Sequence, residues 1–113
     1  MCKVLIVEND LELKVLYRAA IDFQRYEVLM TETIGEAQPL ITIERPSLAV
    51  IDTNCVDFDI LERNQLNIPL FLLTNIPEKD STKLAEKYGA VLALNPLDGS
   101  LGKLIKEIRK VLA

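Results

Sequence analysis

The stretch Leu48-Ala49-Val50-Ile51-Asp52-Thr53-Asn54 is an apolar run that ends on a carboxylate. A short run of aliphatic and β-branched residues, bounded by Pro46 and by polar residues, is typical of a strand buried on both faces of a parallel sheet. Ligands of open α/β sheets bind beyond the carboxyl ends of such strands. Asp52 is therefore the first candidate for a functional residue. The alternative is that Asp52 only ends the strand and caps a turn.

Four further apolar segments predict strands, and segments with helical periodicity separate them. The predicted strands cover Lys3–Val7, Tyr26–Met30, Leu70–Leu73 and Val91–Leu94. Helices are predicted from Leu11 to Phe23, from Thr33 towards Glu44, over a short stretch between Phe58 and Asn64, from Lys79 to Tyr88, and after Ser100. Strands that alternate with helices predict an α/β fold, in which a doubly wound parallel sheet is covered on both faces through right-handed crossovers.

Two of the predicted helices carry more detailed signals. Thr33 and Glu36 have the spacing of a capping box, which predicts that a helix begins after Thr33. Pro39 lies inside this helix and predicts either a kink or a later start, because proline removes a helical hydrogen bond. The first helix is predicted to turn one apolar stripe to the core, formed by Leu13, Leu16, Tyr17, Ala20 and Ile21.

Composition excludes several functional classes. The chain of 113 residues has no histidine, two cysteines and a net charge of -4. These counts exclude histidine-based catalysis and argue against a structural zinc site, so any metal is expected to have oxygen ligands. The acidic balance argues against a nucleic-acid partner, and no apolar run is long enough for a membrane span or has the plan of a signal peptide. We expect one soluble, cytoplasmic domain over residues 1–113.

Polar side chains stand at or just after the ends of four predicted strands. They are Glu8, Asn9, Asp52, Thr74 and Asn95. Because the carboxyl ends of parallel strands meet at one edge of a sheet, we expect these side chains to lie close together. Any one of them alone would be read as an ordinary polar loop residue. Their repeated placement favours a shared site.

These residues, in this order, resemble the receiver domain of two-component response regulators, which has the flavodoxin-like fold of the chemotaxis response regulator. The resemblance covers essentially the whole chain. It rests on Lys3–Asn9 as the first strand with its acidic pair, Ile51–Asn54 as the phosphoacceptor segment, Ile68–Thr74 as the strand with the switch threonine, Gly89-Ala90 as the end of the fourth helix, and Asn95-Pro96 in place of the usual lysine-proline. It implies five parallel strands in the order 2-1-3-4-5.

The resemblance also implies a function in bacterial phosphorelay signal transduction. Asp52 would accept a phosphoryl group from a histidine kinase or a small phosphodonor, and Thr74 would contact the phosphoryl oxygens. Glu8, Asp52 and Asn54 would hold Mg²⁺, a hard cation that prefers oxygen ligands. Such a signalling domain is not an enzyme beyond its own phosphorylation, and no organic cofactor is implied.

The chain departs from the family pattern at several positions. Asn9 replaces the second acid, Asn95 the lysine and Leu92 the aromatic switch residue, while Val56 and Ile60 stand where proline and glycine are usual. The loss of one acid and one lysine leaves the formal charge of the pocket as it is in the family. These changes weaken the expectation of Mg²⁺ binding and of phosphorylation.

Asp10 and the segment between Asp52 and Thr74 also differ from the pattern of receiver domains. Asp10 lies one residue out of register for replacing the missing acid, and we expect it to be solvated instead. The segment between Asp52 and Thr74 is shorter than receiver domains usually have, which predicts a third helix of at most about two turns, roughly seven or eight residues.

Alternatives therefore remain for the function. The first is a phosphorylation-driven switch that uses Mg²⁺, and the second is a pseudo-receiver, a protein-interaction module that works without phosphorylation. A flavin-binding flavodoxin is disfavoured because no phosphate-binding loop follows the first strand.

The predicted partners are a histidine kinase or another signalling protein, with an output domain or a second copy as further options. The face formed by the fourth helix, fifth strand and fifth helix is the surface expected to bind them, with Lys87, Lys103 and Lys106 at its rim. These lysines can equally form a plain solvated face. Neither nucleic acid nor a membrane is expected as a partner of this domain.

Overall fold

The computed structural model describes residues 2–55, 58–62 and 66–113, in which strands and helices alternate. The strands are β1 (Lys3–Val7), β2 (Glu27–Thr31), β3 (Leu48–Asp52), β4 (Leu70–Leu73) and β5 (Leu92–Leu94). The helices are α1 (Leu11–Phe23), α2 (Ile34–Glu44), α3 (Phe58–Glu62), α4 (Glu78–Tyr88) and α5 (Pro96–Leu112), and a 3-10 turn, η1 (Thr53–Cys55), follows β3. All strand pairs are parallel and their order is β2-β1-β3-β4-β5, which confirms the predicted fold class.

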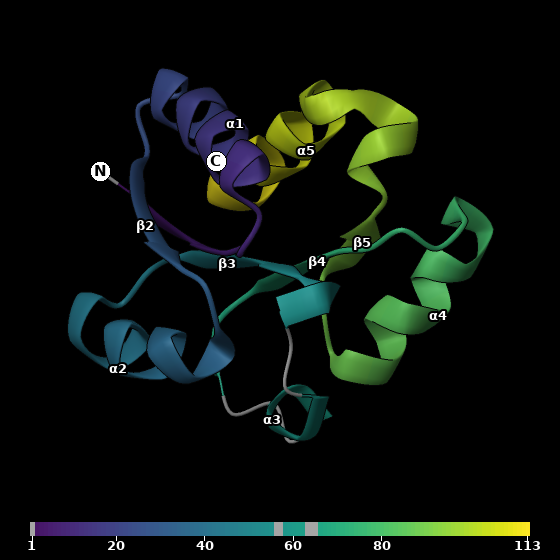
Figure 1. Cartoon of the computed structure of the whole chain (residues 1–113), viewed down its shortest axis with the longest axis horizontal. Helices are drawn as coiled ribbons and strands as arrows, with labels where there is room; N and C mark the ends of the chain where they lie inside the picture. The colour runs from purple at the N-terminus through teal and green to yellow at the C-terminus, as the bar shows by residue number, and fades with distance from the viewer. Residues whose placement is uncertain (1, 56–57, 63–65) are drawn as a thin grey trace.

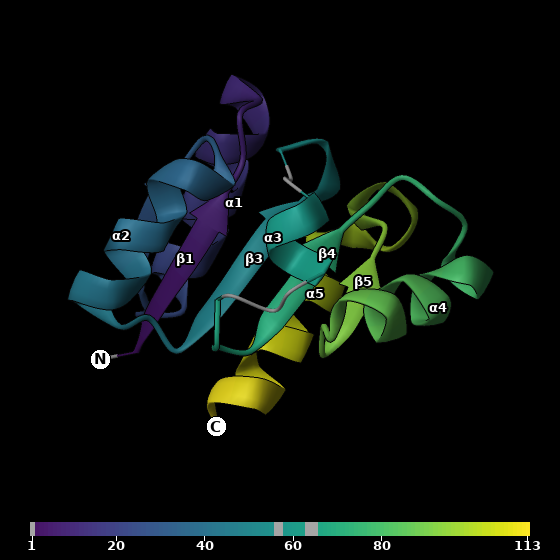
Figure 2. The ribbon, with the colours of Figure 1, turned by 90° about the horizontal axis from the view of Figure 1, so that it is seen from below.

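The sheet separates two apolar cores. Helices α1 and α5 cover one face, and α2, α3 and α4 cover the other (Figure 1). Figure 2 shows β1, β3, β4 and β5 side by side behind α2, α3 and α4. Because side chains alternate along a strand, Val4 and Ile6 pack in the core of α1 and α5, whereas Leu5 and Val7 pack in the core of the other three helices. All four side chains are fully buried, as expected for a strand covered on both faces.

Helix α2 begins directly after its capping box, so the later start is wrong. Thr33 Oγ1 accepts a hydrogen bond from the Glu36 backbone N–H at 3.2 Å, and Glu36 Oε1 accepts one from the Thr33 N–H at 3.2 Å. This reciprocal cap satisfies donors that the first turn leaves without helical partners. The helix then continues through Pro39 to Glu44. The kink at Pro39 stays a prediction.

Helix α5 begins earlier than the sequence pattern predicted. Its first residue is Pro96, so Ser100 lies inside the helix and does not precede it. Proline is favoured at the first helical position, where its missing N–H has no partner to lose and its backbone angle already fits the helix. The Asn95-Pro96 pair is therefore a helix start.

The apolar stripe of α1 is only partly buried. Tyr17 and Ile21 are buried, but Leu16 is 48% exposed, so its assignment to the core is wrong. Leu16 lies about 100° around the helix from Tyr17, which faces the sheet. Together with Phe23 and Ile105, it lines an open apolar groove between α1 and α5.

Within the described residues, helix α3 covers Phe58–Glu62. Residues 56–57 and 63–65 on either side of it lie outside the described part of the chain, so its length of at most about two turns stays a prediction. Val56, which stands where the family has proline, lies outside the described residues. None of the described helices is both long enough and apolar enough to cross a membrane.

The capping box of α2 provides a test of how this fold is stabilised. We expect Thr33→Ala to lower the free energy of unfolding by about 1 kcal/mol, because the Glu36 backbone N–H loses its acceptor, Thr33 Oγ1. The matched control is Thr42→Ala, since Thr42 is an exposed threonine of the same helix whose hydroxyl donates only to the Gln38 carbonyl at 3.4 Å. Urea unfolding should separate the two variants, and equal losses would contradict a role for the cap.

Candidate functional site

The pairing of β1 with β3 brings two carboxylates together at the carboxyl edge of the sheet. Val7 is paired with Ile51, so the next residues along the two strands, Glu8 and Asp52, lie side by side. Glu8 is fully buried, and its N–H donates to the Thr31 carbonyl of β2 at 3.0 Å. Asp52 is partly buried at the end of β3.

The Glu8 carboxylate has partners on one oxygen. Oε2 accepts hydrogen bonds from the backbone N–H groups of Asn9 at 3.1 Å and Asp10 at 3.3 Å. Oε1 is buried and accepts no hydrogen bond from the described residues. A buried carboxylate oxygen without a donor is costly, so this oxygen calls for a proton or a cation.

Burial is the main reason that Glu8 is hard to ionise. Burial, followed by hydrogen bonding to Asp52 and the like charge of Asp52, raises the pKa of Glu8, while the backbone donors of Asp10 and Asn9 lower it; the net result is a pKa of about 7. Near neutral pH without a cation, Glu8 therefore carries a proton for much of the time. This proton can lie between the two carboxyl groups.

Asp52 also forms the turn that follows β3. Its Oδ1 accepts a hydrogen bond from the backbone N–H of Asn54 at 2.8 Å, which is the usual local bond of an aspartate at the start of a turn. Both interpretations of Asp52 from the sequence therefore agree with its position, because it ends the strand at a turn and also stands next to Glu8. Asn54 itself is exposed.

Thr74 stands across a small cavity from this turn. It follows β4, is buried, and its N–H donates to the Leu94 carbonyl at 2.8 Å. Its Oγ1 accepts a hydrogen bond from the Ile76 N–H at 3.3 Å. Thr74 lines a cavity of about 90 Å³ together with Leu13, Tyr17, Asp52, Asn54, Leu73 and Asn75. The predicted Asp52, Asn54 and Thr74 therefore come together at one cavity.

Asn95, Leu92 and Asn9, which depart from the family pattern, are not among the residues that line this cavity. Asn95 is partly buried, and its Nδ2 donates to the Ile76 carbonyl at 3.4 Å, so it holds the segment between β4 and α4. Leu92 packs against the core of α1 and α5. Asn9 is exposed, and its backbone N–H binds Glu8.

Asp10 does not replace the missing acid. It is exposed, as expected, and its Oδ1 accepts a hydrogen bond from the Leu13 N–H at 3.0 Å, which makes it the N-cap of α1. Its role here is therefore to begin the helix that covers the cavity.

Sequence reasoning missed Cys55. Ligand atoms of Glu8, Asp52 and Cys55 all lie within 4.8 Å of one another. The turn η1 explains this position, because a 3-10 turn advances three residues per turn and so brings Cys55 back over Asp52. The thiol is partly buried, and burial raises the pKa of Cys55 to about 11. The available signal was the three-residue spacing from Asp52.

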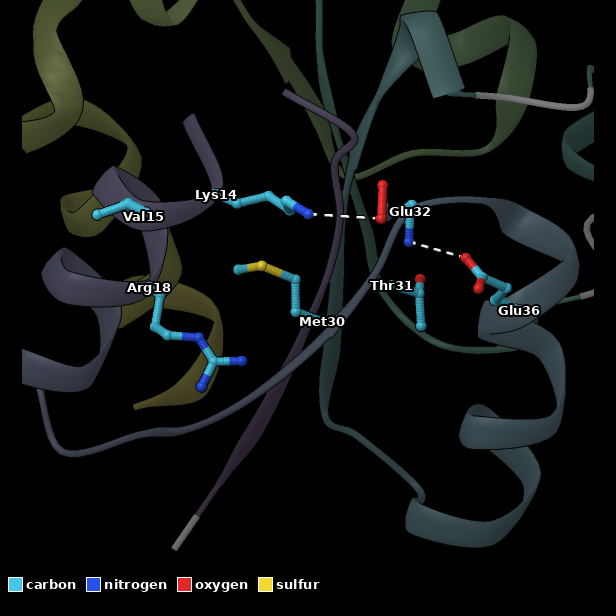
Figure 3. Close-up of a pocket in the computed structure, with 7 residues that line it drawn as sticks. All are labelled: Lys14, Val15, Arg18, Met30, Thr31, Glu32 and Glu36. Carbon is cyan, nitrogen blue, oxygen red and sulfur yellow. Dashed lines mark hydrogen bonds and ion pairs between the residues drawn. The ribbon is translucent and has the colours of Figure 1, made fainter. Parts of the chain in front are cut away.

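A larger pocket lies apart from this site, between α1 and the end of β2 (Figure 3). Its volume is about 400 Å³; Lys14 points toward Glu32, and Arg18 and Glu36 also line it. Lys14 Nζ is 3.5 Å from Glu32 Oε1, and the Glu32 N–H donates to Glu36 Oε1 at 3.1 Å. The two basic and two acidic side chains offset each other, and the pocket contains neither Asp52 nor Thr74.

Comparison with known proteins gives a consistent result for the fold. No protein-family model and no curated protein sequence matches the chain. Among solved structures, it is similar to the BeF3-activated N-terminal receiver domain of RstA from Klebsiella pneumoniae, with a TM-score of 0.82, 23% sequence identity and 97% of both chains covered. It is also similar to the chemotaxis response regulator CheY4 of Vibrio cholerae, with a TM-score of 0.83, 19% identity and 98% of both chains covered.

A third similar structure is HP1043, an orphan response regulator of H. pylori, with a TM-score of 0.80, 17% identity, and coverage of 99% of this chain and 97% of that chain. At these identities the likeness concerns the fold. It confirms that this chain has the fold of response-regulator receiver domains, as the sequence predicted.

The buried Glu8 predicts a specific dependence of stability on pH. Its pKa is about 7 in the folded chain against an ordinary value of 4.5, so the folded state binds more protons than the unfolded state between these values. Stability should therefore fall as the pH rises from about 5 to about 7.5, by roughly 2 to 3 kcal/mol in the absence of divalent cations. Urea unfolding over this range measures the decrease.

Glu8→Gln should remove most of this decrease, because a neutral amide can donate to Asp52 as the protonated carboxyl does. Glu12→Gln is the matched control, since Glu12 is an exposed acid on α1. If Glu8→Gln unfolds with the same pH dependence as the parent chain, Glu8 is not the group that titrates.

Proposed function

We propose that this chain, which has the fold of response-regulator receiver domains, works as a receiver domain of a two-component signal transduction system. In this proposal residues 1–113 form the domain and Asp52 is its phosphoacceptor. The observation that supports it most is the Glu8–Asp52 carboxylate pair at the carboxyl edge of the sheet, with Thr74 at the same cavity. The domain acts in signalling and catalyses no reaction beyond its own phosphorylation.

The residues of the cavity suggest how phosphoryl transfer proceeds. A carboxylate oxygen of Asp52 attacks the phosphorus of a histidine kinase or a small phosphodonor, and the bond to the donor's leaving group breaks. The Asn54 N–H holds Asp52 Oδ1 and so fixes the orientation of the carboxylate. Thr74 Oγ1 already accepts the Ile76 N–H, which leaves its own O–H proton to donate to a phosphoryl oxygen.

The same residues fit a hard divalent cation in part. Glu8, Asp52 and the main-chain carbonyl of Asn54 are the candidate ligands, and the buried Oε1 of Glu8 lacks a positive partner among the described residues. These residues would hold Mg²⁺, which would supply positive charge to offset the charge of the Asp52 carboxylate and of an anionic donor. Asn9 offers only an amide oxygen, which is a weaker ligand for such a cation than a carboxylate. Mg²⁺ affinity is therefore low in this proposal.

A second candidate function is a pseudo-receiver that binds partners without phosphorylation. Asn95 favours it, because its side chain is an uncharged amide that donates to the Ile76 carbonyl. None of the residues that line the cavity in the described part of the chain is a lysine or an arginine. Transition-state charge on a transferring phosphoryl group then has little stabilisation from the protein.

These two candidates differ in the labelling of Asp52 by a small phosphodonor. We expect labelling at least about tenfold slower than in the double variant Asn9→Asp/Asn95→Lys, because an acid and a cation at the site each lower the barrier and 1.36 kcal/mol already gives a factor of ten. Intact mass at millimolar Mg²⁺ follows the reaction, and Asp52→Asn is the unlabelled control.

Labelling of the double variant but not of the parent chain would favour the pseudo-receiver. Rapid, stoichiometric labelling of the parent chain, accompanied by a large spectral change, would instead contradict the low Mg²⁺ affinity and slow phosphorylation proposed here. Labelling of Asp52→Asn would exclude Asp52 as the phosphoacceptor.

The face formed by α4, β5 and α5 is our proposed binding surface for a histidine kinase, another signalling protein or an output domain. Lys87 and Lys106 are exposed there, and Lys87 Nζ lies 5.4 Å from the centre of the Tyr88 ring. Leu92 is packed against the core of α1 and α5, and it lacks a ring that could change position on phosphorylation. Partner binding on this face is therefore independent of phosphorylation.

Charge reversal tests this surface. Lys103→Glu should weaken partner binding severalfold, because basic rim residues attract an acidic partner surface. Arg18→Glu, an exposed basic residue on α1, is the control for net charge. Isothermal titration with the partner kinase or output domain measures both affinities, and unchanged binding of Lys103→Glu would count against this face.

A further inference from the structure

We propose that Cys55 is a third metal ligand beside Glu8 and Asp52, so that this site prefers a thiophilic divalent cation such as Zn²⁺ or Co²⁺ to Mg²⁺. The inference deepens the proposed function, because it concerns the cation of the same site. It rests on the arrangement of three side chains and not on phosphoryl transfer.

The arrangement suits a single ion. Glu8, Asp52 and Cys55 each offer one ligand atom, and these atoms lie within 4.8 Å of one another. Zinc binds oxygen and sulfur at about 2.0 to 2.3 Å in tetrahedral geometry, so two ligand atoms of one ion lie roughly 3.3 to 3.8 Å apart. Movements of these side chains on the order of 1 Å bring all three atoms to one ion. The Asn54 N–H bond to Asp52 holds the turn that carries Cys55 in place.

A second observation points to a ligand independently of this spacing. The Glu8 side chain is 0% exposed, and its Oε1 has no hydrogen-bond partner among the described residues. Native proteins seldom leave a buried carboxylate oxygen without a donor or a cation. Without a metal, a proton between Glu8 and Asp52 satisfies this oxygen, and a bound ion would replace that proton.

The chemistry of the ligands selects the class of ion. Mg²⁺ takes oxygen ligands and gains nothing from sulfur, whereas a thiolate favours zinc and the metals that resemble it. Asn9 stands where the family has an acid, which removes a hard anionic ligand, and Cys55 adds a soft one. On binding, the thiol proton passes to solvent and the sulfur becomes a thiolate. The ion then has three anionic ligands.

The chain contains its own control. Cys2 is also free and partly buried, but it precedes β1, at the opposite edge of the sheet. The length of β1 separates it from Glu8 by roughly 20 Å, at about 3.3 Å per residue. Metal binding that depends on Cys55 and not on Cys2 must therefore occur at the carboxyl edge.

Titration of the full chain with Co²⁺ tests the proposal. A thiolate-to-cobalt charge-transfer band should appear in the parent chain and in Cys2→Ser, and Zn²⁺ should remove it by displacing the cobalt. Cys55→Ser should lose the band and bind Co²⁺ and Zn²⁺ at least about tenfold more weakly, because even groups that only support a ligand contribute that much. Its affinity for Mg²⁺ should be unchanged. Glu8→Gln should weaken Co²⁺ binding as well.

The absence of the band in the parent chain, its loss in Cys2→Ser, or equal Zn²⁺ affinity of Cys55→Ser and the parent chain would overturn the proposal. Asp52 labelling at millimolar Mg²⁺ is measured on the same variants. Labelling without a cobalt band leaves the receiver function standing and removes the metal preference. A cobalt band without labelling leaves the metal site standing and removes the phosphoacceptor.

Discussion

The pairing of β1 with β3 is the constraint on which the site depends. The two strands lie in the middle of the sheet, buried on both faces, and their register sets Val7 beside Ile51. A shift of one residue would turn every side chain of β1 into the opposite core, where side chains of different size and shape would have to fit the same close-packed space. The residues that follow the two strands, Glu8 and Asp52, are thereby fixed side by side. Glu8 and Asp52 are therefore brought together by the apolar packing of β1 and β3, which itself contacts no ligand.

In this buried position, the ionised Glu8 carboxylate lowers the stability of the folded state. Two backbone N–H groups hold one of its oxygens, and the other is buried without a donor among the described residues. The free energy gained by burying the apolar side chains of β1 offsets this cost. Anything that supplies positive charge or a proton between Glu8 and Asp52 recovers part of that free energy. Binding chemistry at this edge thus couples directly to the stability of the central strands.

The sequence predicted the features that depend on local patterns. Apolar runs between polar residues located all five strands to within about a residue, and the capping box at Thr33 located α2. Where tertiary contacts decide, the sequence was insufficient: Leu16 fits the helical stripe, yet α5 leaves it exposed. The start of α5 was misread because Ser100 resembled a cap, whereas Pro96 suits a first helical position. Cys55 was missed because a single 3-10 turn leaves no trace in hydrophobic periodicity.

The segment after β4 limits how far this domain can respond to a phosphoryl group. Ile76 is held twice, because its N–H donates to Thr74 Oγ1 and its carbonyl accepts from Asn95 Nδ2. Both are bonds between uncharged groups, each with a net value of about 1 kcal/mol. Reversing a two-state equilibrium from 1:99 to 99:1 takes about 5.5 kcal/mol of differential binding. A lysine at position 95 would bring a full positive charge to the phosphoryl group, whereas the Asn95 amide, which already donates to the Ile76 carbonyl, brings none. If Asp52 is phosphorylated as proposed, we therefore expect little free energy for a rearrangement of this segment and little change in its arrangement.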